Sequence, residues 1–336
     1  MVDYKFTMFN KNLYNTPFHS EDLSQYKFLI TGGAGFIGSN IVEYLIRYNA
    51  GHVRVLDNLS NGYYENIKDF IGLSNFEFIQ GDIRNIDACS DAVEGIDFIC
   101  HQAALGSVPR SIKDPLASNE VNIVGFLNML DSAKKSNALK RFVYAASSST
   151  YGDSTTLPKK EENIGNPLSP YAVTKYVNEL YADVYSKVYG FKSIGLRYFN
   201  VFGPKQSPDN PYAAVIPLFI KAALSSQKPV INGDGTVSRD FTFVENAVQA
   251  NIKAFFNSVN IERHEVFNIA CGKQTDLNKL WSIITSKVGI SVTPSYGSQR
   301  PGDIKASLAD ISKAQTVLQY EPVIDIELGL ELTLRA

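Results

Sequence analysis

Short apolar segments, rich in β-branched and aromatic residues, alternate with helical patterns along the first 200 residues of the chain. The apolar segments are each bounded by polar or turn residues and predict strands at 27–31, 53–57, 76–80, 97–101, 141–146 and 193–198. Helical periodicity predicts helices at 36–48, 120–135 and 171–189. This alternation indicates an α/β fold with a doubly wound, mostly parallel sheet of the Rossmann type.

Beyond about residue 200 the chain changes to loops rich in Pro and Gly, separated by a few predicted helices such as 244–257 and 276–288. We therefore expect residues 1–200 to hold an N-terminal extension and a dinucleotide-binding domain, to which 240–270 also contributes. Residues 201–336 should form mainly a smaller, substrate-binding domain that closes a cleft over the carboxyl edge of the sheet.

Composition narrows the class of protein. The chain has 336 residues, 44% of them hydrophobic, and a net charge of -2 with dispersed lysines and arginines, which argues against nucleic-acid binding. The three cysteines lie far apart and the four histidines show no metal-ligand spacing, so we expect a reduced, metal-free, cytoplasmic protein. Residues 1–26 lack the apolar stretch of a signal peptide or membrane anchor, and we expect them to pack on the first domain.

A glycine-rich turn follows the first predicted strand. Such a turn needs residues without Cβ, and Gly32 or Gly33, Gly35 and Gly38 supply them before the next helix opens. Amides at a helix N-terminus bind phosphate, so the segment predicts a pyrophosphate site. Asp57 ends the second strand, 19 residues past Gly38, where its carboxylate can bind both ribose hydroxyls.

The residues next to Asp57 select the dinucleotide. They are Asn58, Leu59 and Ser60, with no Lys or Arg to receive a 2′-phosphate, so we expect NAD rather than NADP. Asp82 and Ile83 follow the third strand, where they can meet the adenine, although an Asp at a strand end is also a common turn former.

Tyr171 and Lys175 are four residues apart and share one face of a predicted helix, which Ser169 would cap ahead of a first-turn proline, Pro170. A nearby ammonium and an oxidised nicotinamide both favour the phenolate, so we expect the pKa of Tyr171 to fall and the phenol to act as acid and base. The spacing alone is common by chance. Small hydroxyl residues from Ser147 onward, at the end of a buried strand where such sheets bind ligands, strengthen the interpretation.

From about Lys27 onward the chain resembles the extended short-chain dehydrogenase/reductase family, and within it the nucleotide-sugar 4-epimerases, most closely those of UDP-N-acetylglucosamine. The resemblance is carried by Thr31-Gly32-x-x-Gly35-x-x-Gly38, His101-Gln102-Ala103-Ala104, Ser147 through Gly152, Tyr171-x-x-x-Lys175, Arg197-Tyr198-Phe199-Asn200-Val201-Phe202-Gly203, Ser238-Arg239-Asp240-Phe241 and Arg300-Pro301-Gly302-Asp303.

This resemblance implies three catalytic residues. Ser147 would hydrogen-bond the reacting sugar oxygen, Tyr171 would be the acid and base, and Lys175 would hold the nicotinamide ribose and lower the pKa of the phenol. Hydride would leave C4 of the sugar for NAD+ and return to the other face of a 4-keto sugar, so the cofactor should stay tightly bound.

The resemblance also implies two sets of binding residues. Those expected at the cofactor are Gly32, Gly35, Phe36, Ile37, Gly38, Asp57, Asn58, Ser60, Gly62, Asp82, Ile83, Gln102, Ala103, Ala104, Asn122, Tyr171, Lys175, Tyr198 and Val201. Those expected at the UDP-sugar are Gly106, Ser107, Ser147, Ser148, Ser149, Tyr171, Asn200, Gln206, Ala214, Val215, Asn232, Arg239, Arg300, Asp303 and Ser307. Among the second set, Asn200, Arg239 and Arg300 would bind the diphosphate, and Asp303 would lie near the uridine ribose.

Two positions divide the chain from its relatives. Ser148 and Ser149 stand where the similar 4,6-dehydratases carry an acidic pair, so elimination lacks its acid and base. Ser307 stands where epimerases confined to non-acetylated sugars carry a tyrosine, which leaves room for an N-acetyl group and favours UDP-GlcNAc and UDP-GalNAc.

Two alternatives remain, a 4-epimerase of the uronic sugars UDP-GlcNAcA and UDP-GalNAcA, and a catalytically silent NAD-binding sensor of nucleotide sugars. The helices 120–135 and 171–189 resemble the pair through which family members dimerise, so a homodimer is expected, although their apolar faces could equally be buried within one chain.

Overall fold

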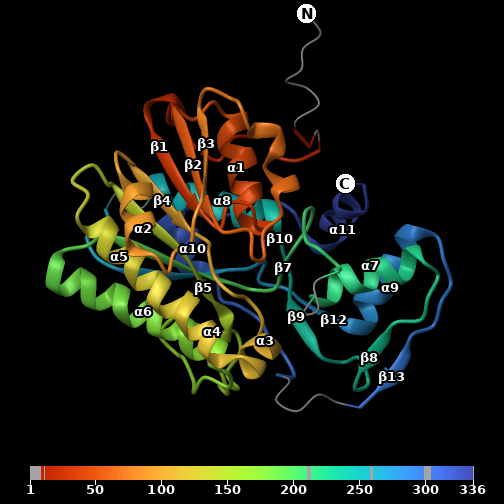
Figure 1. Cartoon of the computed structure of the whole chain (residues 1–336). Helices are drawn as coiled ribbons and strands as arrows, with labels where there is room; N and C mark the ends of the chain where they lie inside the picture. The colour runs from red at the N-terminus through yellow and green to blue at the C-terminus, as the bar shows by residue number, and fades with distance from the viewer. Residues whose placement is uncertain (1–8, 11, 210–212, 258–259, 299–303, 336) are drawn as a thin grey trace, which may run out of the picture.

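The computed structural model describes residues 9–10, 12–209, 213–257, 260–298 and 304–335. At its centre is a seven-stranded sheet with the order β3-β2-β1-β4-β5-β6-β11, in which every neighbouring pair is parallel (Figure 1). The strands are β1 (Lys27–Thr31), β2 (His52–Asp57), β3 (Phe76–Gln80), β4 (Phe98–His101), β5 (Arg141–Ser147), β6 (Ser193–Tyr198) and β11 (Glu265–Ile269). The strand order reverses between β1 and β4, as in a Rossmann fold, and the predicted fold class is confirmed.

Helices cover both faces of this sheet (Figure 1). One face carries α1 (Phe36–Arg47), α8 (Val244–Phe256) and α10 (Ser312–Leu318), and the other carries α2 (Ile86–Val93), α5 (Phe126–Lys134) and α6 (Pro170–Tyr189). Each face buries its own apolar cluster, so the sheet is covered on both sides, and β4 and β6 are buried along their whole length.

The predicted helix at 120–135 is present over 120–134, but its first six residues are π-helical rather than α-helical. Two short helices, α3 (Val108–Lys113) and α4 (Pro115–Asn119), run into a π-helical segment, Glu120–Gly125, before α5 begins at Phe126. Short π segments within helices are common at functional sites. Helix α6 begins as predicted, because the Ser169 side chain accepts a hydrogen bond from the amide of Ala172 ahead of Pro170.

Part of the C-terminal region lies beside the sheet rather than on it (Figure 1). It contains α7 (Val215–Leu224) packed on α9 (Leu277–Val288), and Phe219 meets Trp281 edge to face with ring centroids 5.5 Å apart. The C-terminal part of the chain also contains three two-stranded pairs and ends with α11 (Ile326–Leu334). The pairs are β7 (Val201–Phe202) with β10 (Thr242–Phe243), β8 (Val230–Asn232) with β13 (Ser295–Gly297), and β9 (Ser238–Asp240) with β12 (Gln274–Asp276).

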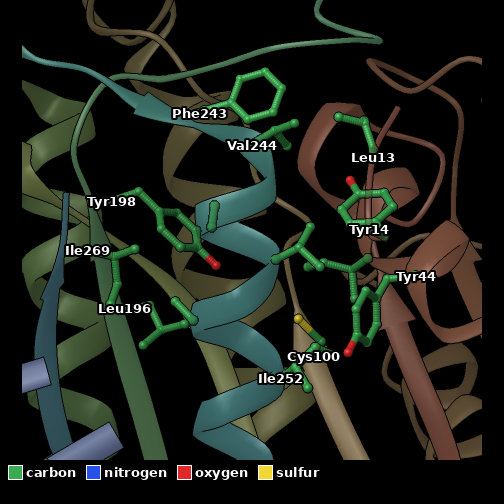
Figure 2. Packing of buried hydrophobic residues seen from close by; sticks show 14 of the residues in the cluster. Leu13, Tyr14, Tyr44, Cys100, Leu196, Tyr198, Phe243, Val244, Ile252 and Ile269 are labelled. Atoms are coloured by element: carbon green, nitrogen blue, oxygen red, sulfur yellow. The ribbon is translucent and has the colours of Figure 1, made fainter. Parts of the chain in front are cut away.

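The N-terminal segment, here residues 9–26 apart from Lys11, packs on α1 and α8. Leu13 and Tyr14 are buried beside Tyr44, in the same apolar cluster as Val244 (Figure 2). No helix among the described residues is long and apolar enough to cross a membrane.

Candidate active site

A cavity of about 550 Å³ opens at the carboxyl edge of the sheet, near the point where the strand order reverses. Ligands of open α/β sheets bind at this place. The glycine turn after β1, the ends of β2, β3, β4, β5 and β6, and the first turn of α6 all contribute residues to its wall. Segments that are far apart in the sequence therefore meet at one site.

Two glycines of the turn have no room for a side chain. Gly32 has a φ of +67°, and a Cβ there would lie 2.7 Å from the amide nitrogen of Ala103. A Cβ on Gly38 would lie 2.2 Å from the carbonyl oxygen of Gly32. The turn can therefore pack against the residue that follows β4 and against α1 only if both positions are glycine.

The turn fits a dinucleotide pyrophosphate. Gly35 is the N-cap residue of α1 and lies in the wall of the cavity. A Cβ placed there would lie 3.1 Å from the carbonyl oxygen of Gly32 and would meet no other atom closely. A phosphate can thus approach the helix amides, which carry a partial positive charge.

Asp57 ends β2 and lies in the cavity wall, where it is 7% exposed. Its carboxylate accepts hydrogen bonds from the amides of Ala34 (3.0 Å) and Leu59 (2.8 Å). Burial raises its pKa, and those two amides oppose the rise. A carboxylate has four acceptor sites, so two remain for ribose hydroxyls.

The described loop that follows Asp57, residues 58–62, contains no Lys or Arg, and the arginines beside it are bound to partners. Arg110 donates to the side-chain oxygen of Asn61 at 3.1 Å. Arg84 pairs with Asp82 at 2.7 Å, and Asn58 donates to the same carboxylate at 2.9 Å. The Arg84 hydrogen bonds lower the pKa of Asp82 to about 2, so this acid stays ionised. The negative charge of Asp57 suits the free ribose hydroxyls of NAD and would repel the 2′-phosphate of NADP.

Ser147, Tyr171 and Lys175 converge at the other end of the cavity. The hydroxyl of Ser147 accepts hydrogen bonds from the amide (3.1 Å) and hydroxyl (2.9 Å) of Ser149, and it also hydrogen-bonds Tyr171. The ammonium of Lys175 lies 6.0 Å from the centroid of the Tyr171 ring and donates to the carbonyl of Ala145 at 2.8 Å. The helix spacing thus brings the pair together as predicted.

The electrostatics of this pair are those of the protein without NAD. Burial raises the pKa of Tyr171, and a hydrogen bond from Ser147 opposes that rise. The predicted fall, which includes the charge of NAD+, stays a prediction. Lys175 is itself desolvated, so its pKa falls to about 8, with Glu179 partly opposing that fall. The protein alone does not make the phenol acidic, because a buried phenolate would be poorly solvated.

Most of the predicted site residues lie in the wall of the cavity. They are Gly32, Gly35, Phe36, Ile37, Gly38, Asp57, Asn58, Ser60, Gly62, Asp82, Ile83, Gln102, Ala103, Ala104, Gly106, Ser107, Ser147, Ser148, Tyr171, Lys175, Tyr198, Asn200, Val201, Gln206 and Ala214.

Other predicted residues lie behind or beside the cavity wall. Asn122, on the π-helical segment, binds both backbone groups of Leu105, accepting from its amide at 2.8 Å and donating to its carbonyl at 3.1 Å. Asn122 therefore holds the segment around Leu105, which lines the cavity, in place. The remaining residues outside the wall are Ser149, Val215, Asn232, Arg239 and Ser307.

The residues predicted at the diphosphate and at the acetamido group are only partly described. Arg239 donates to the carbonyls of Ser238 (2.9 Å) and Ile304 (2.7 Å), and Ser307 donates its amide to the carbonyl of Ser238 (3.1 Å). Both lie along β9. Arg300 and Asp303 lie outside the described residues, so the role of Ser307 as a size gate stays a prediction.

Some cavity residues were not predicted. Lys205 and Ser207 follow the motif that ends at Gly203, and Tyr63 follows the predicted Gly62. The signal in the sequence that could have found these residues is their position next to the predicted motifs. Among the described residues, no group of His, Cys, Asp and Glu is arranged to hold a metal ion.

The fold and this constellation define a dinucleotide-dependent enzyme of the extended short-chain dehydrogenase/reductase type. A model of the NAD dependent epimerase/dehydratase family matches residues 28–270. The chain belongs to this family, and its cofactor is NAD.

Similar proteins within the family act on UDP-sugars. A putative UDP-glucose 4-epimerase of Methanocaldococcus jannaschii is 37% identical over 305 residues, which cover 90% of this chain and 95% of the relative. A UDP-N-acetylglucosamine 4-epimerase of Methanobrevibacter ruminantium, solved with UDP-N-acetylmuramic acid, is 39% identical with a TM-score of 0.86, covering 92% of this chain and 97% of that one. A UDP-glucuronic acid 4-epimerase of Bacillus cereus, solved with UDP-glucuronic acid and NAD, is 34% identical with a TM-score of 0.85, covering 92% and 98%. The chain is therefore a member of the UDP-sugar 4-epimerase group, whose members differ in the sugar.

Proposed function

We propose that the protein interconverts UDP-GlcNAc and UDP-GalNAc by inverting C4 of the sugar, with NAD held tightly throughout. The observation that supports this most is the convergence of Ser147, Tyr171 and Lys175 on the cavity next to the glycine turn. Ser148 and Ser149 are neutral, so the site has no acid and base pair there for elimination.

Tyr171 removes the proton from the sugar O4 and later returns it. Ser147 holds that oxygen through its hydroxyl and also hydrogen-bonds the phenol, so the proton moves along a short path between fixed groups. Lys175 keeps a positive charge close to the phenol. Bound NAD+ supplies the hydride chemistry at C4 and a second positive charge, which offsets the effect of burial on Tyr171.

The charges in the cavity support a neutral sugar over a uronate. In the described part of the wall the cations are Lys175 and Lys205. Lys175 donates to Ala145, and Lys205 pairs with Glu43 at 2.9 Å. A carboxylate at C6 would have to draw one of them from its partner, whereas a hydroxymethyl group would not.

Small residues support an acetamido group at C2. Gly106, Ser107 and Ala214 line the same cavity as Ser147 and have small or no side chains. A bulky side chain at any of these three positions would reduce the volume of the cavity. This supports UDP-GlcNAc and UDP-GalNAc over UDP-Glc and UDP-Gal.

Product analysis tests the proposal. Purified protein is incubated with UDP-GalNAc and no added nicotinamide, and the sugars are separated after hydrolysis. We expect UDP-GlcNAc to form. Conversion of UDP-GlcNAcA without conversion of UDP-GalNAc would identify the uronate enzyme, and bound NAD without any conversion would identify a sensor.

We further propose that the protein is a homodimer formed through α6 and its neighbours. Val173, Leu180, Val184 and Val188 are each at least 45% exposed and repeat along one side of α6. Such a stripe is typical of a helix that packs on another molecule. Sedimentation would test this, with Val184→Glu expected to give monomers.

A further inference from the structure

Two side chains of α1 each join the N-terminal segment to one loop of the cavity wall. Asn40 and Glu43 lie one turn apart and are 0% and 3% exposed. Each has one partner in the N-terminal segment and another in residues 203–207, here called the wall loop. Helix α1 is also the helix that the glycine turn opens.

Asn40 uses the two ends of its amide. Its oxygen accepts a hydrogen bond from the hydroxyl of Tyr14 at 2.7 Å, and its nitrogen donates to the carbonyl of Pro204 at 3.2 Å. The Tyr14 side chain is fully buried, and Figure 2 shows it beside Tyr44. The backbone amide of Tyr14 donates to Glu245 on α8 at 3.0 Å, so the segment is anchored at this point from two sides.

The two carboxylate oxygens of Glu43 also bind one partner in each of the two segments. One accepts from the amide of Asn10 at 2.9 Å, and the other pairs with the ammonium of Lys205, also at 2.9 Å. The carboxylate is buried and the lysine is about one-quarter exposed. Breaking a pair of this kind leaves a charge without compensation, so the contact fixes the loop firmly.

The wall loop and the residues before it have an unfavourable backbone conformation that needs such anchors. Asn200, Gly203 and Lys205 have φ values of +34°, +148° and +70°. Asn200 and Lys205 are not glycine, and residues with side chains keep this conformation only when their surroundings hold them in it.

The wall loop contacts Tyr63, a residue that is itself hydrogen-bonded to the glycine turn. The hydroxyl of Tyr63 donates to that of Ser207 at 3.4 Å, and both residues lie in the cavity wall. The amide of Tyr63 donates to the carbonyl of Ala34 within the glycine turn at 3.0 Å. The wall loop therefore rests against the segment that frames the pyrophosphate site.

We propose that Asn40 and Glu43 are positioning residues that, backed by the N-terminal segment, hold the wall loop over the glycine turn and so slow the release of NAD. An enzyme that inverts C4 regains its oxidised cofactor in every cycle, and slow release keeps it ready for the next sugar. This inference rests on the proposed function for its purpose and on this chain's own contacts for its geometry.

The exchange of bound NAD+ for radiolabelled NAD+, without any sugar, measures the effect. Lys205→Met removes the ammonium from Glu43, and Tyr14→Phe removes the one hydroxyl that binds Asn40 from behind. We expect exchange to be about tenfold faster in Lys205→Met and about threefold faster in Tyr14→Phe. Tyr14 does not line the cavity, so its effect would have to pass through Asn40 and the wall loop.

Two control variants separate this effect from a general loss of charge or stability. Lys287→Met removes a lysine of α9 that is about as exposed as Lys205 and pairs with Glu331 at 3.2 Å. Ile284→Val trims a fully buried side chain of α9, away from the cavity. Both should exchange NAD+ within twofold of the wild-type rate.

Wild-type exchange in Tyr14→Phe, with the protein folded by circular dichroism, would overturn the inference. So would an equal acceleration in Ile284→Val, which would make the effect one of stability. If the wild-type protein binds no NAD+ at all, the proposed function fails as well, and the wild-type measurement alone shows it.

Discussion

Replacing Lys175 with Met should change how the stability of the NAD-free protein depends on pH. The lysine is 4% exposed, and burial lowers its pKa from the ordinary 10.5 to about 8. Below pH 8 the folded protein must therefore keep a charge that water would solvate better, and this opposes folding. Met has a similar length and carries no charge, so the variant is free of this effect.

The magnitude follows from the lowered pKa. A pKa lower by about 2.5 corresponds to roughly 3 kcal/mol, at about 1.4 kcal/mol for each pH unit. The full amount acts below pH 8 and disappears as the pH rises toward 10.5, because the lysine is then neutral in both states. Loss of the hydrogen bond to the Ala145 carbonyl costs the variant about 1–3 kcal/mol at every pH.

Urea unfolding followed by circular dichroism, at pH 7 and at pH 10, measures this prediction. The free energy of unfolding of Lys175→Met minus that of the wild type should fall by about 2–3 kcal/mol between the two pH values. Lys221→Met, an exposed control, should show a difference close to zero at both. A difference for Lys175→Met that does not change with pH would refute the claim that Lys175 is held in a desolvated site.

Three further substitutions test the site. Tyr171→Phe should reduce turnover about 10²- to 10⁴-fold while NAD stays bound, because the ring still packs and the proton carrier is gone; near-normal turnover, measured by product analysis, would mean that another group moves the proton. Ser307→Tyr should shift the preference toward UDP-Glc and UDP-Gal by about tenfold or more in kcat/KM, and unchanged selectivity would remove this position as the gate. Gly38→Ala should lower both NAD content and stability, the latter by about 1–3 kcal/mol, because the new Cβ would lie 2.2 Å from the Gly32 carbonyl; a fully loaded, equally stable variant would show that the turn can open.

The sequence was most informative where a motif is local. The glycine turn and the pair of Tyr171 and Lys175 are set by short spacings, and Asp57 is found at the end of the next strand, 19 residues past Gly38. All of them line the cavity. The strands of the first 200 residues are also placed to within a residue or two, because apolar runs between turn residues leave few alternatives.

Features that depend on distant partners could not be predicted in this way. The sequence predicts that residues 240–270 contribute to the first domain, but it predicts no strand there. The pairing of β11 with β6 depends on a partner that the sequence of β11 does not identify. The contact between Glu43 and Lys205 links residues far apart in the chain. The raised pKa of Tyr171 follows from burial, which depends on how the wall of the cavity closes and not on the neighbouring lysine.

The most direct measurement of the central claim uses UDP-GlcNAc carrying deuterium at C4, in ordinary water and with no added NAD. The account predicts UDP-GalNAc that keeps its deuterium at C4, because the hydrogen leaves and returns within the closed site while Tyr171 handles only the proton on oxygen. UDP-GalNAc that has lost the label, or no UDP-GalNAc at all, would contradict it.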